Sequence, residues 1–357
     1  MQLTLVVPEL IWPEPDDPYT LNDLPCAGLS TLIARSRLSR RPPQSLEATL
    51  CDAFGLSEGA AYAPFRLLGE SAAQAPADAR WLCADPVHLR LHQERLILAD
   101  GGSLAIALDE AQAIAGELNR QFADVGTFHV ATADRWYLQL AADFDVGDLS
   151  HFDVLPLSLV TGRRVGRQLP ETPQARALRQ LLNEVQMVLH GQAANEQREE
   201  SGRPTINSLW LWGAGVLPAA RASDFSSVWS EQPLARGLGR AFAVPVQAPP
   251  ASAAEWLALR AGAPAGGQQL LLLDALQGTV QYEDADAYRA ALLRLEEHWF
   301  APLQKALAGG KIKRLQLHAP TAYATLAWDS GRAEQWQLWR RPRSLAATAQ
   351  ALARGEP

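Results

Sequence analysis

Apolar and polar positions along the chain follow two periods, and these predict alternating strands and helices. The β-branched run Leu3–Val7, closed by Pro8, predicts a buried strand because it is too short for a helix. Apolar residues from Leu24 to Leu38 recur at near-helical spacing and predict a helix over residues 21–41, and residues 45–56 predict a second one. The chain therefore opens as strand, loop, helix, helix.

The middle of the chain changes to short alternating strands around one helix. Alternation over Val87–Leu91 and Arg95–Leu98 predicts two strands joined by a turn. The apolar face of Asp109–Phe122 predicts a helix, and two more strands are expected at Thr127–Val130 and Arg135–Leu140. This order of elements indicates a small α+β lobe.

The last half of the chain alternates apolar strands with amphipathic helices. Helices are predicted at residues 174–189, 253–261 and 286–307, and strands at residues 206–212, 241–246, 270–273, 315–317 and 335–340. Buried apolar strands between helices are typical of an α/β sheet with helices on both faces.

Length, composition and charge limit the kinds of core, partner and cellular location that we expect for this protein. A chain of 357 residues that is 48% apolar can bury one large core or two smaller ones. Its net charge of −7 disfavours nucleic acid as a partner, so we expect the local arginine clusters to be solvated surface. Three cysteines without a pairing pattern, no signal peptide and no apolar run near the roughly 20 residues of a membrane span predict a cytoplasmic protein without a membrane partner.

Short sequence motifs give only weak evidence for a catalytic or cofactor-binding site. The chain has no metal-spaced Cys/His cluster, and Gly213-Ala214-Gly215 and Gly237-Leu238-Gly239 are only half-matches to a dinucleotide loop. Asp274 and His318 close or follow predicted strands, and strand ends at the carboxyl edge of such sheets line clefts.

A longer motif is more specific. It reads Asn195-x-x-Arg198-x-x-x-Gly202-x-x-x-x-Asn207-x-x-Trp210-x-Trp212-Gly213-x-Gly215-x-x-Pro218. With Asp85–Arg90 and Tyr288–Pro302, it resembles the cofactor-independent phosphoglycerate mutases of archaeal type, in the alkaline phosphatase superfamily. The whole chain is more similar still to the RpfE-type bacterial regulatory proteins related to those mutases, through segments such as Trp339–Pro342.

The resemblance implies a fold and a chemistry. The fold class is α/β, an alkaline-phosphatase-like mixed sheet with helices on both faces and an inserted small α+β lobe. The core is expected at residues 1–78 and 203–357, and the lobe at residues 79–202. Active members of the family use two divalent metals and a serine nucleophile, which together carry and clamp the phosphoryl group.

This sequence departs from the family pattern where the metals would bind. Pro8-Glu9 replaces the Asp-Gly after the first strand, Asp274 replaces a histidine, and the Asp-His-x-Thr-Pro signature is reduced around His318. One Glu, one Asp and one His are too few ligands for two dications, so we expect no metal and no cofactor. Ser30 is the candidate for the catalytic hydroxyl.

Two groups of residues are therefore candidates for binding. An anionic or phosphorylated small molecule is the expected ligand of the first group, in which the arginine fork and the close backbone approach of glycine would contact it; alternatively, this stretch pins the lobe to the core. Its members are Asn195, Arg198, Asn207, Trp212, Gly213 and Gly215. The second group, expected at the cleft, consists of Glu9, Trp12, Asp274 and His318.

These residues leave three functions open. The leading hypothesis is a non-catalytic mutase relative that acts as a sensor or regulatory partner. The alternative is an active phosphoglycerate mutase or phosphomonoesterase with a rebuilt metal site, in which a divalent metal would bind. The third is a structural or interaction protein with an exposed aromatic surface. Most of the eleven tryptophans are expected in the core, and Trp12 and Trp212, which follow strands at the expected cleft edge, are the exceptions.

Overall fold

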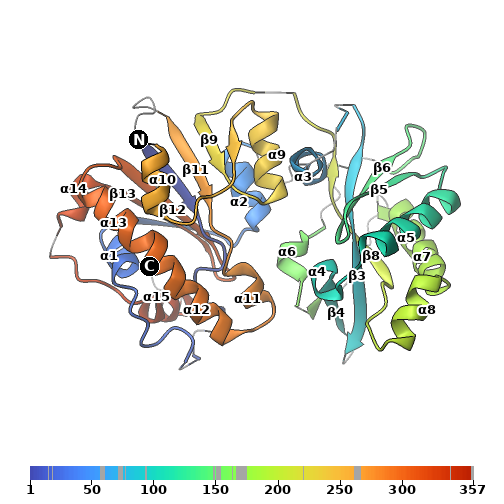
Figure 1. Cartoon of the computed structure of the whole chain (residues 1–357), viewed down its shortest axis with the longest axis horizontal. Helices are drawn as coiled ribbons and strands as arrows, with labels where there is room; N and C mark the ends of the chain where they lie inside the picture. The colour runs from blue at the N-terminus through green and yellow to red at the C-terminus, as the bar shows by residue number, and fades with distance from the viewer. Residues whose placement is uncertain are drawn as a thin grey trace. The chain divides into compact units, whose positions relative to one another are not determined.

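The structure is a computed structural model with two sheets, each accompanied by its own helices (Figure 1). It describes residues 1–14, 16–17, 19–56, 61–70, 75–76, 78–92, 95–147, 149, 154–162, 164–165, 175–219, 221–260, 267–337 and 339–354. The chain divides into two compact units, the first of residues 1–49, 222–235 and 242–357, and the second of residues 50–221 and 236–241.

Sheet A belongs to the first unit and is mixed. Five neighbouring strands run parallel, and two more follow at one end, each paired antiparallel with the strand before it. In spatial order they are β10 (Val246–Gln247), β9 (Phe225–Trp229), β11 (Gln268–Leu272), β1 (Gln2–Val6), β12 (Arg314–Pro320), β13 (Thr325–Gly331) and β2 (Arg37–Arg41). The predicted α/β class with a mixed sheet is thus confirmed for this unit.

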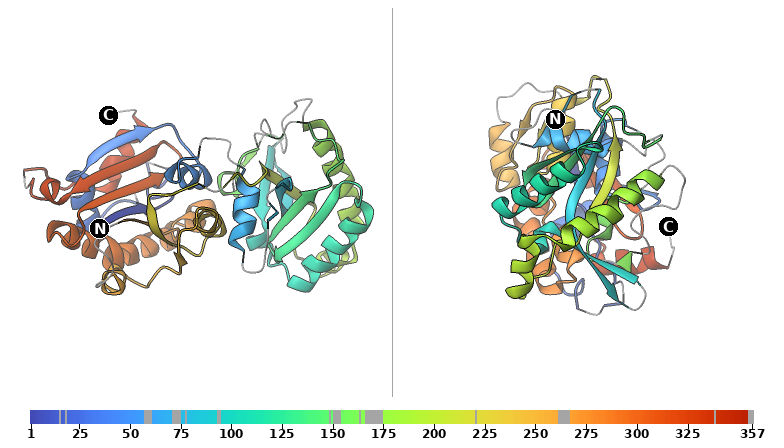
Figure 2. Two further views of the ribbon diagram at one scale, coloured as in Figure 1. Left: turned by 90° about the horizontal axis from the view of Figure 1, so that it is seen from above. Right: turned by 90° about the vertical axis from the view of Figure 1, so that its right-hand side faces the viewer.

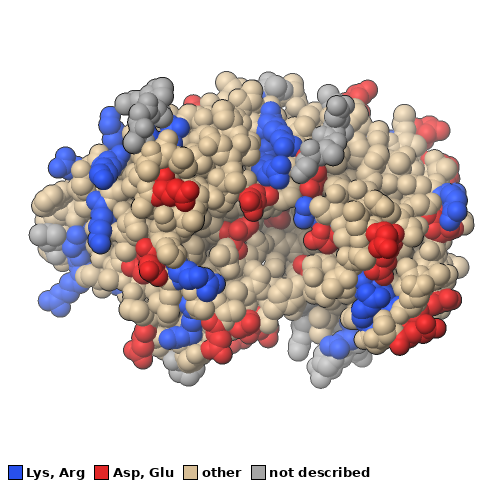
Figure 3. Space-filling view, viewed as in Figure 1, with Lys and Arg blue, Asp and Glu red and all other residues tan. Residues whose placement is uncertain are grey.

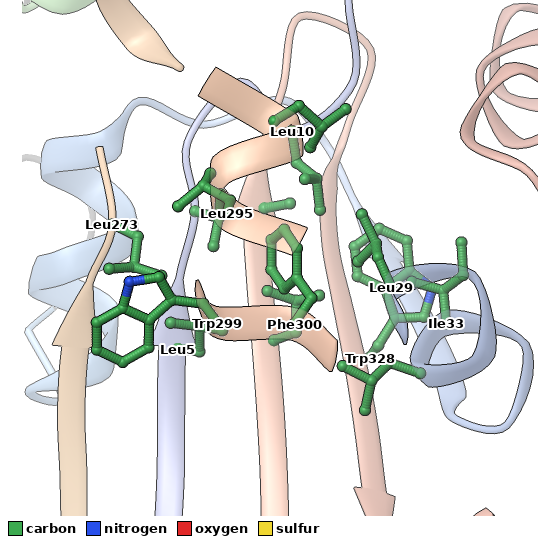
Figure 4. Close-up of a cluster of buried hydrophobic side chains, with 14 of the residues drawn as sticks. Leu5, Leu10, Leu29, Ile33, Leu273, Leu295, Trp299, Phe300 and Trp328 are labelled. Carbon is green, nitrogen blue, oxygen red and sulfur yellow. The ribbon is translucent and has the colours of Figure 1, made fainter. Parts of the chain in front are cut away.

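One face of sheet A packs against helices of the same unit. Leu5 of β1 contributes to a core that includes Leu29 and Ile33 of α1 and the aromatic pair Trp299 and Phe300 (Figure 4). The left view of Figure 2 shows the orange helices as a layer beside the strands. The helices of this unit are α1 (Ala27–Ala34), α10 (Ala253–Leu259), α11 (Gln277–Gln281), α12 (Ala285–Leu295), η3 (Glu296–Phe300), α13 (Ala301–Ala308), α14 (Arg332–Gln335) and α15 (Leu345–Ala353). Helices α2 (Leu46–Ala53) and α9 (Pro233–Ala241) cross the division between the units.

The opposite face of sheet A is covered as well. Thr4 and Val6 of β1 and Leu270 and Leu272 of β11 alternate with the core residues, and all four are buried. Strands buried on both faces explain the continuous apolar runs of the sequence.

Sheet B forms the second unit together with helices α3 (Tyr62–Gly69), α4 (Gly101–Leu104), α5 (Leu108–Gln121), α6 (Leu157–Val160), α7 (Arg176–His190) and α8 (Ala193–Glu200). Its long strand β3 pairs with β8 over its first half, while β6 and β4 pair with its beginning and its end. The strands are β5 (Gly126–Thr132), β6 (Arg135–Leu140), β3 (Trp81–His92), β4 (Arg95–Asp100), β7 (Arg164–Val165) and β8 (Ser208–Gly215). The amphipathic helix α7 buries Leu178, Leu182 and Val185 at helical spacing and packs beside β8 (Figure 2, right).

The second unit is larger than the lobe expected at residues 79–202. It includes α3 before residue 79 and β8 after residue 202. The reason is strand pairing: β8 hydrogen-bonds along β3, and α3 packs on both of these strands.

One helix prediction is wrong. Of the helix expected over residues 21–41, only α1 forms, and it ends at Ala34. Beyond its end, the backbone N–H of Ser36 donates to the carbonyl of Ile33, and the hydroxyl of Ser36 donates to the carbonyl of Leu32 at 2.6 Å. Arg37–Arg41 then pair residue by residue with β13 as the last strand of the sheet. Pairing with a distant strand outweighed the local helical pattern.

Two strand predictions are wrong in a similar way. Residues 241–246 hold the end of α9 and only the first residue of β10, and residues 335–340 follow strand β13, which the alternation did not reveal. The helix predicted at residues 286–307 is confirmed as α12, η3 and α13 in succession. Within the described ranges, no helix combines the length and apolar composition needed to cross a membrane.

Candidate functional site

The carboxyl ends of three parallel strands bring all four cleft candidates to one edge of the sheet in the first unit. Glu9 and Trp12 follow β1, Asp274 follows β11, and His318 lies near the end of β12, which pairs with β1. Glu9 has a left-handed backbone with φ 56°, and its N–H donates to the carbonyl of Pro320 at 2.9 Å. The topology therefore places these residues along one sheet edge, and their side chains decide whether they form a site.

Tyr288 of α12 is the centre of a buried polar cluster at this edge. Its ring lies edge-on to the ring of Trp12, with centroids 5.1 Å apart, and its hydroxyl donates to the carbonyl of Leu10 at 2.7 Å. Burial raises the pKa of Tyr288 well above its ordinary value, and the nearby carboxylate of Glu9 raises it further. Tyr288 therefore remains a neutral donor, and Glu9 and Trp12 lie beside it in the core of the first unit.

Glu296 of η3 supplies the polar partner for the beginning of α1. Its Oε1 accepts from the N–H of Gly28 at 2.6 Å, and its Oε2 accepts from the N–H of Leu29 at 3.0 Å. Cys26 occupies the N-cap position without a side-chain hydrogen bond, so this distant carboxylate satisfies amides that a helix leaves open. Burial and the charge of Glu296 raise the pKa of the Cys26 thiol to about 11.

Ser30 lies in the first turn of α1 and is half-buried. Its N–H donates to the carbonyl of Cys26 at 2.9 Å, an ordinary contact of a helix start. The role of its hydroxyl as a nucleophile stays a prediction.

Asp274 has a different environment from Glu9. Asp274 is exposed, yet desolvation by the surrounding protein raises the pKa of its carboxyl group, and the negative charge of Glu231 raises that pKa further. Glu231 follows β9 closely, so these two carboxylates lie at the ends of neighbouring strands.

His318 points away from the Tyr288 cluster. Leu315, Leu317 and Ala319 of the same strand face the helical core, so the alternation of a strand directs His318 to the opposite face. There it lies near Asp329, whose pKa is lowered chiefly by its hydrogen bonds with Arg314 and also by His318. Glu9, Asp274 and His318 thus occupy three different environments, and no three Asp, Glu, His or Cys side chains in the described part of the chain are grouped to hold a metal ion.

The expected ligand-binding residues of the long motif are engaged by the protein itself. The amide of Asn195 donates to the carbonyls of Leu189 and Ile206 at 2.7 and 2.8 Å and accepts from the N–H of Ile206. The side chain of Asn207 exchanges two hydrogen bonds with the backbone of Leu89. Both asparagines therefore fasten the segment before β8 to neighbouring elements of the second unit.

Arg198 is buried and makes an equally complete set of contacts. Its guanidinium forms a two-point ion pair with Glu110 of α5, with Nη2 and Oε2 3.0 Å apart. Its Nη1 donates to the carbonyls of Leu104 and Pro204 at 3.0 and 2.8 Å. These contacts hold elements of the second unit to one another, and the alternative interpretation, in which this stretch pins the lobe to the core, stays a prediction.

Trp212, Gly213 and Gly215 line a close approach between β8 and the start of α3. Gly213 has φ +64°, and a Cβ there would lie 2.9 Å from the Cβ of Tyr62. A Cβ on Gly215 would overlap Ala61. The glycines thus permit two protein segments to touch, as they would permit contact with a ligand.

The sequence did not reveal a buried ion pair beside Trp212. Arg66 of α3 forms a two-point contact with Asp85 of β3 at 2.8–3.0 Å, and Asp85 also accepts from the indole of Trp212 at 2.8 Å. The guanidinium lies over the rings of Tyr137 and Trp212, with Cζ 5.3 and 5.4 Å from their centroids. Burial lowers the pKa of Arg66, but the charge and hydrogen bonds of Asp85 and the other groups around the guanidinium together outweigh burial and keep that pKa well above its ordinary value. The sequence did contain one signal for this pair: Asp85 is an acidic residue within an apolar strand, and a buried carboxylate requires a buried partner.

Comparisons with known proteins support part of the resemblance. No family model matches the chain. A stretch of 93 residues is 33% identical to a probable 2,3-bisphosphoglycerate-independent phosphoglycerate mutase of Geobacter sulfurreducens. That match covers 24% of this chain and 23% of the relative, so the chain matches less than a quarter of the relative's length.

Two solved structures have a similar fold. The cofactor-independent phosphoglycerate mutase from Thermoplasma acidophilum aligns over 98% of this chain and 94% of its own, with a TM-score of 0.51 and 14% identity. The PH0037 protein from Pyrococcus horikoshii aligns over 92% of this chain and 87% of its own, with a TM-score of 0.54 and 15% identity. The expected alkaline-phosphatase-like α/β fold is thereby confirmed.

Proposed function

We propose that this chain is a non-catalytic relative of the phosphoglycerate mutases that acts by binding, as a regulatory protein of the RpfE type. One observation carries the proposal: the side chains of Glu9, Asp274 and His318 lie in three environments although their strands are neighbours. Transfer of a phosphoryl group by two metals requires ligands that converge on one point. No divalent metal or other cofactor is part of the proposed function.

The state of Glu9 supports the proposal. Its carboxylate is buried beside Tyr288 and Trp12, in a core of large side chains that a hydrated dication would disrupt. Glu296 likewise directs both oxygens at the first turn of α1, where an anionic group of a substrate would otherwise benefit from the helix dipole.

The binding of an anionic ligand by the long motif stays a prediction. A phosphate at Arg198 would have to displace Glu110 from a two-point ion pair, and a ligand at Asn195 would have to displace backbone groups. We therefore place greater weight on a protein partner than on a phosphorylated small molecule.

The alternative of an active enzyme has one observation in its favour. Asp274 and Glu231 lie at neighbouring strand ends, and the charge of Glu231 raises the pKa of Asp274, a repulsion that a bound cation relieves. A rebuilt metal site in a mutase or phosphomonoesterase would use this pair, with Ser30 as the nucleophile.

Activity and metal content of the purified chain distinguish the two functions. We expect no hydrolysis of 4-nitrophenyl phosphate and no interconversion of 2- and 3-phosphoglycerate with Mn²⁺ or Zn²⁺, and no stoichiometric metal after dialysis. The Thermoplasma mutase provides the positive control. Metal-dependent turnover that Ser30→Ala abolishes would overturn the proposal and establish the alternative.

A further inference from the structure

Strand β2 leaves one edge of sheet A open. It is the terminal strand in the order of the sheet, and it pairs with β13 alone among the strands of the described chain. All five of its residues, Arg37–Arg41, are exposed. An edge strand of this kind presents backbone N–H and C=O groups that can pair with another extended chain.

Two exposed tryptophans lie beside the beginning of this strand. Trp336 and Trp339 are 61% and 76% exposed, whereas most tryptophans of the chain are buried. The neighbouring backbone fixes their position: Arg35 donates to the carbonyl of Gln335 at 2.8 Å, and Arg340 donates to the carbonyl of Ser36 at 3.2 Å. The segment that carries the tryptophans is therefore held next to the residues that precede β2.

The surface is strongly basic although the chain carries a net charge of −7. Residues 35–41 contain four arginines and residues 332–343 contain four more, against a single acidic residue, Glu334. Glu334 itself accepts from the N–H of Gly331 at 3.0 Å. Figure 3 shows lysine and arginine side chains along the margin where Figure 1 places α14.

We propose that this surface, called here the β2 surface, binds an acidic extended segment of a partner protein as an added strand. It consists of β2 with Trp336, Trp339, Arg340, Arg341 and Arg343. Main-chain hydrogen bonds to an edge strand supply affinity in such complexes, and side chains beside the edge supply specificity. Tryptophan and arginine are the residues that dominate binding energy at interfaces, and arginine pairs with carboxylates in a two-point geometry.

Three other roles of this surface are weaker. In the first, the arginines on the edge strand have no role except to prevent aggregation, but two exposed tryptophans would promote aggregation instead. Pairing of β2 with β2 of a second copy would bring arginines against arginines. Nucleic acid is disfavoured by the overall negative charge.

Fluorescence anisotropy of a labelled peptide tests the proposal with the full chain. The probe is a ten-residue peptide that alternates glutamate with valine, and its two controls replace glutamate by lysine or insert a central proline. We expect binding of the acidic peptide alone. Trp339→Ala and the double variant Arg341→Glu/Arg343→Glu should each weaken it at least tenfold.

Matched changes in the second unit serve as controls. Met187 is as exposed as Trp339, and Arg176 is exposed on α7, so Met187→Ala and Arg176→Glu should bind the peptide like the unchanged chain. Thermal unfolding monitored by circular dichroism identifies any variant that fails to fold, and Trp336→Ala then replaces it.

Several outcomes would overturn the inference. They are absence of binding, equal binding of the lysine or proline peptide, or a single-stranded oligonucleotide that binds while the acidic peptide does not. The inference goes beyond the proposed loss of catalysis, because peptide binding and phosphatase activity are separate readouts. Activity in the enzyme assay would leave this result unaffected.

Discussion

The carboxylate of Glu296 accepts a hydrogen bond from the backbone N–H of Gly28 at 2.6 Å, across 268 positions of sequence. Its second oxygen accepts from Leu29, so one side chain of η3 satisfies two amides at the beginning of α1. Because this contact is buried, it contributes more to the stability of the fold than a helix cap at the surface would.

We predict that Glu296→Gln lowers the free energy of unfolding by about 1–3 kcal/mol, because an amide offers one acceptor where the carboxylate offers two. Urea denaturation of the two proteins measures the difference. Glu297→Gln, an exposed neighbour on the same turn, is the control and should change stability little. Equal effects of the two changes would show that the hydrogen bonds to α1 contribute nothing.

The Cys26 thiol should make stability depend on pH in the alkaline range. Its pKa is raised from 9.0 to about 11, so the folded chain keeps a proton that the unfolded chain releases. This contribution is complete below pH 9 and is lost as the pH rises towards 11. Between about pH 8.5 and about pH 10.5 the unchanged chain should lose about 2 kcal/mol more than Cys26→Ala. Denaturation curves at the two pH values test this, and parallel losses would contradict it.

Asp85→Asn should be strongly destabilising, by about 3–5 kcal/mol, because it leaves the guanidinium of Arg66 buried without its counter-charge. Replacement of both partners, as Arg66→Met with Asp85→Leu, should recover much of this loss, since neither charge is then buried. Thermal and urea unfolding of the single and double variants give the coupling. A double variant no more stable than Asp85→Asn would contradict this interpretation.

Gly237 should not tolerate a side chain. A Cβ there would overlap the carbonyl oxygen of Phe65, so Gly237→Ala should cost about 1–3 kcal/mol through displaced backbone. Gly116 of α5 is a control at which alanine should raise the free energy of unfolding instead of lowering it, because nothing lies within 4 Å of its Cβ position. Gly116→Ala should stabilise the chain by about 0.5–1 kcal/mol through helix propensity. Unfolding midpoints that shift in the same direction would contradict the packing role assigned to Gly237.

Arg198→Ala distinguishes a structural role from ligand binding. If the contacts with Glu110 and two carbonyls are its purpose, the substitution should lower stability by about 3–5 kcal/mol in the absence of any ligand. Differential scanning fluorimetry with and without added phosphate measures both effects. A variant of unchanged stability that has lost a phosphate-dependent shift would instead support the predicted anion site.

Sequence alone determined the elements that rest on local pattern. The strand at Leu3–Val7, the helix at residues 286–307 and the α/β class follow from apolar periodicity, which burial imposes wherever an element packs on a core. The fold implied by the resemblance was also correct, as the similar solved structures show. Residues at the ends of the parallel strands could likewise be placed at one edge from topology alone.

Tertiary structure alone decided which side chains meet. The strand β2 exists because β13 offers it a partner across almost 300 positions, and no local signal reports that pairing. The same holds for Glu296 with Gly28 and for Arg66 with Asp85, whose contacts depend on how distant segments pack. Alternation along β12 also directs His318 away from the helical core that its neighbours Leu317 and Ala319 join, although the topology places His318 near the same sheet edge as Glu9. The sequence names the candidate groups, but packing determines which of them can act together.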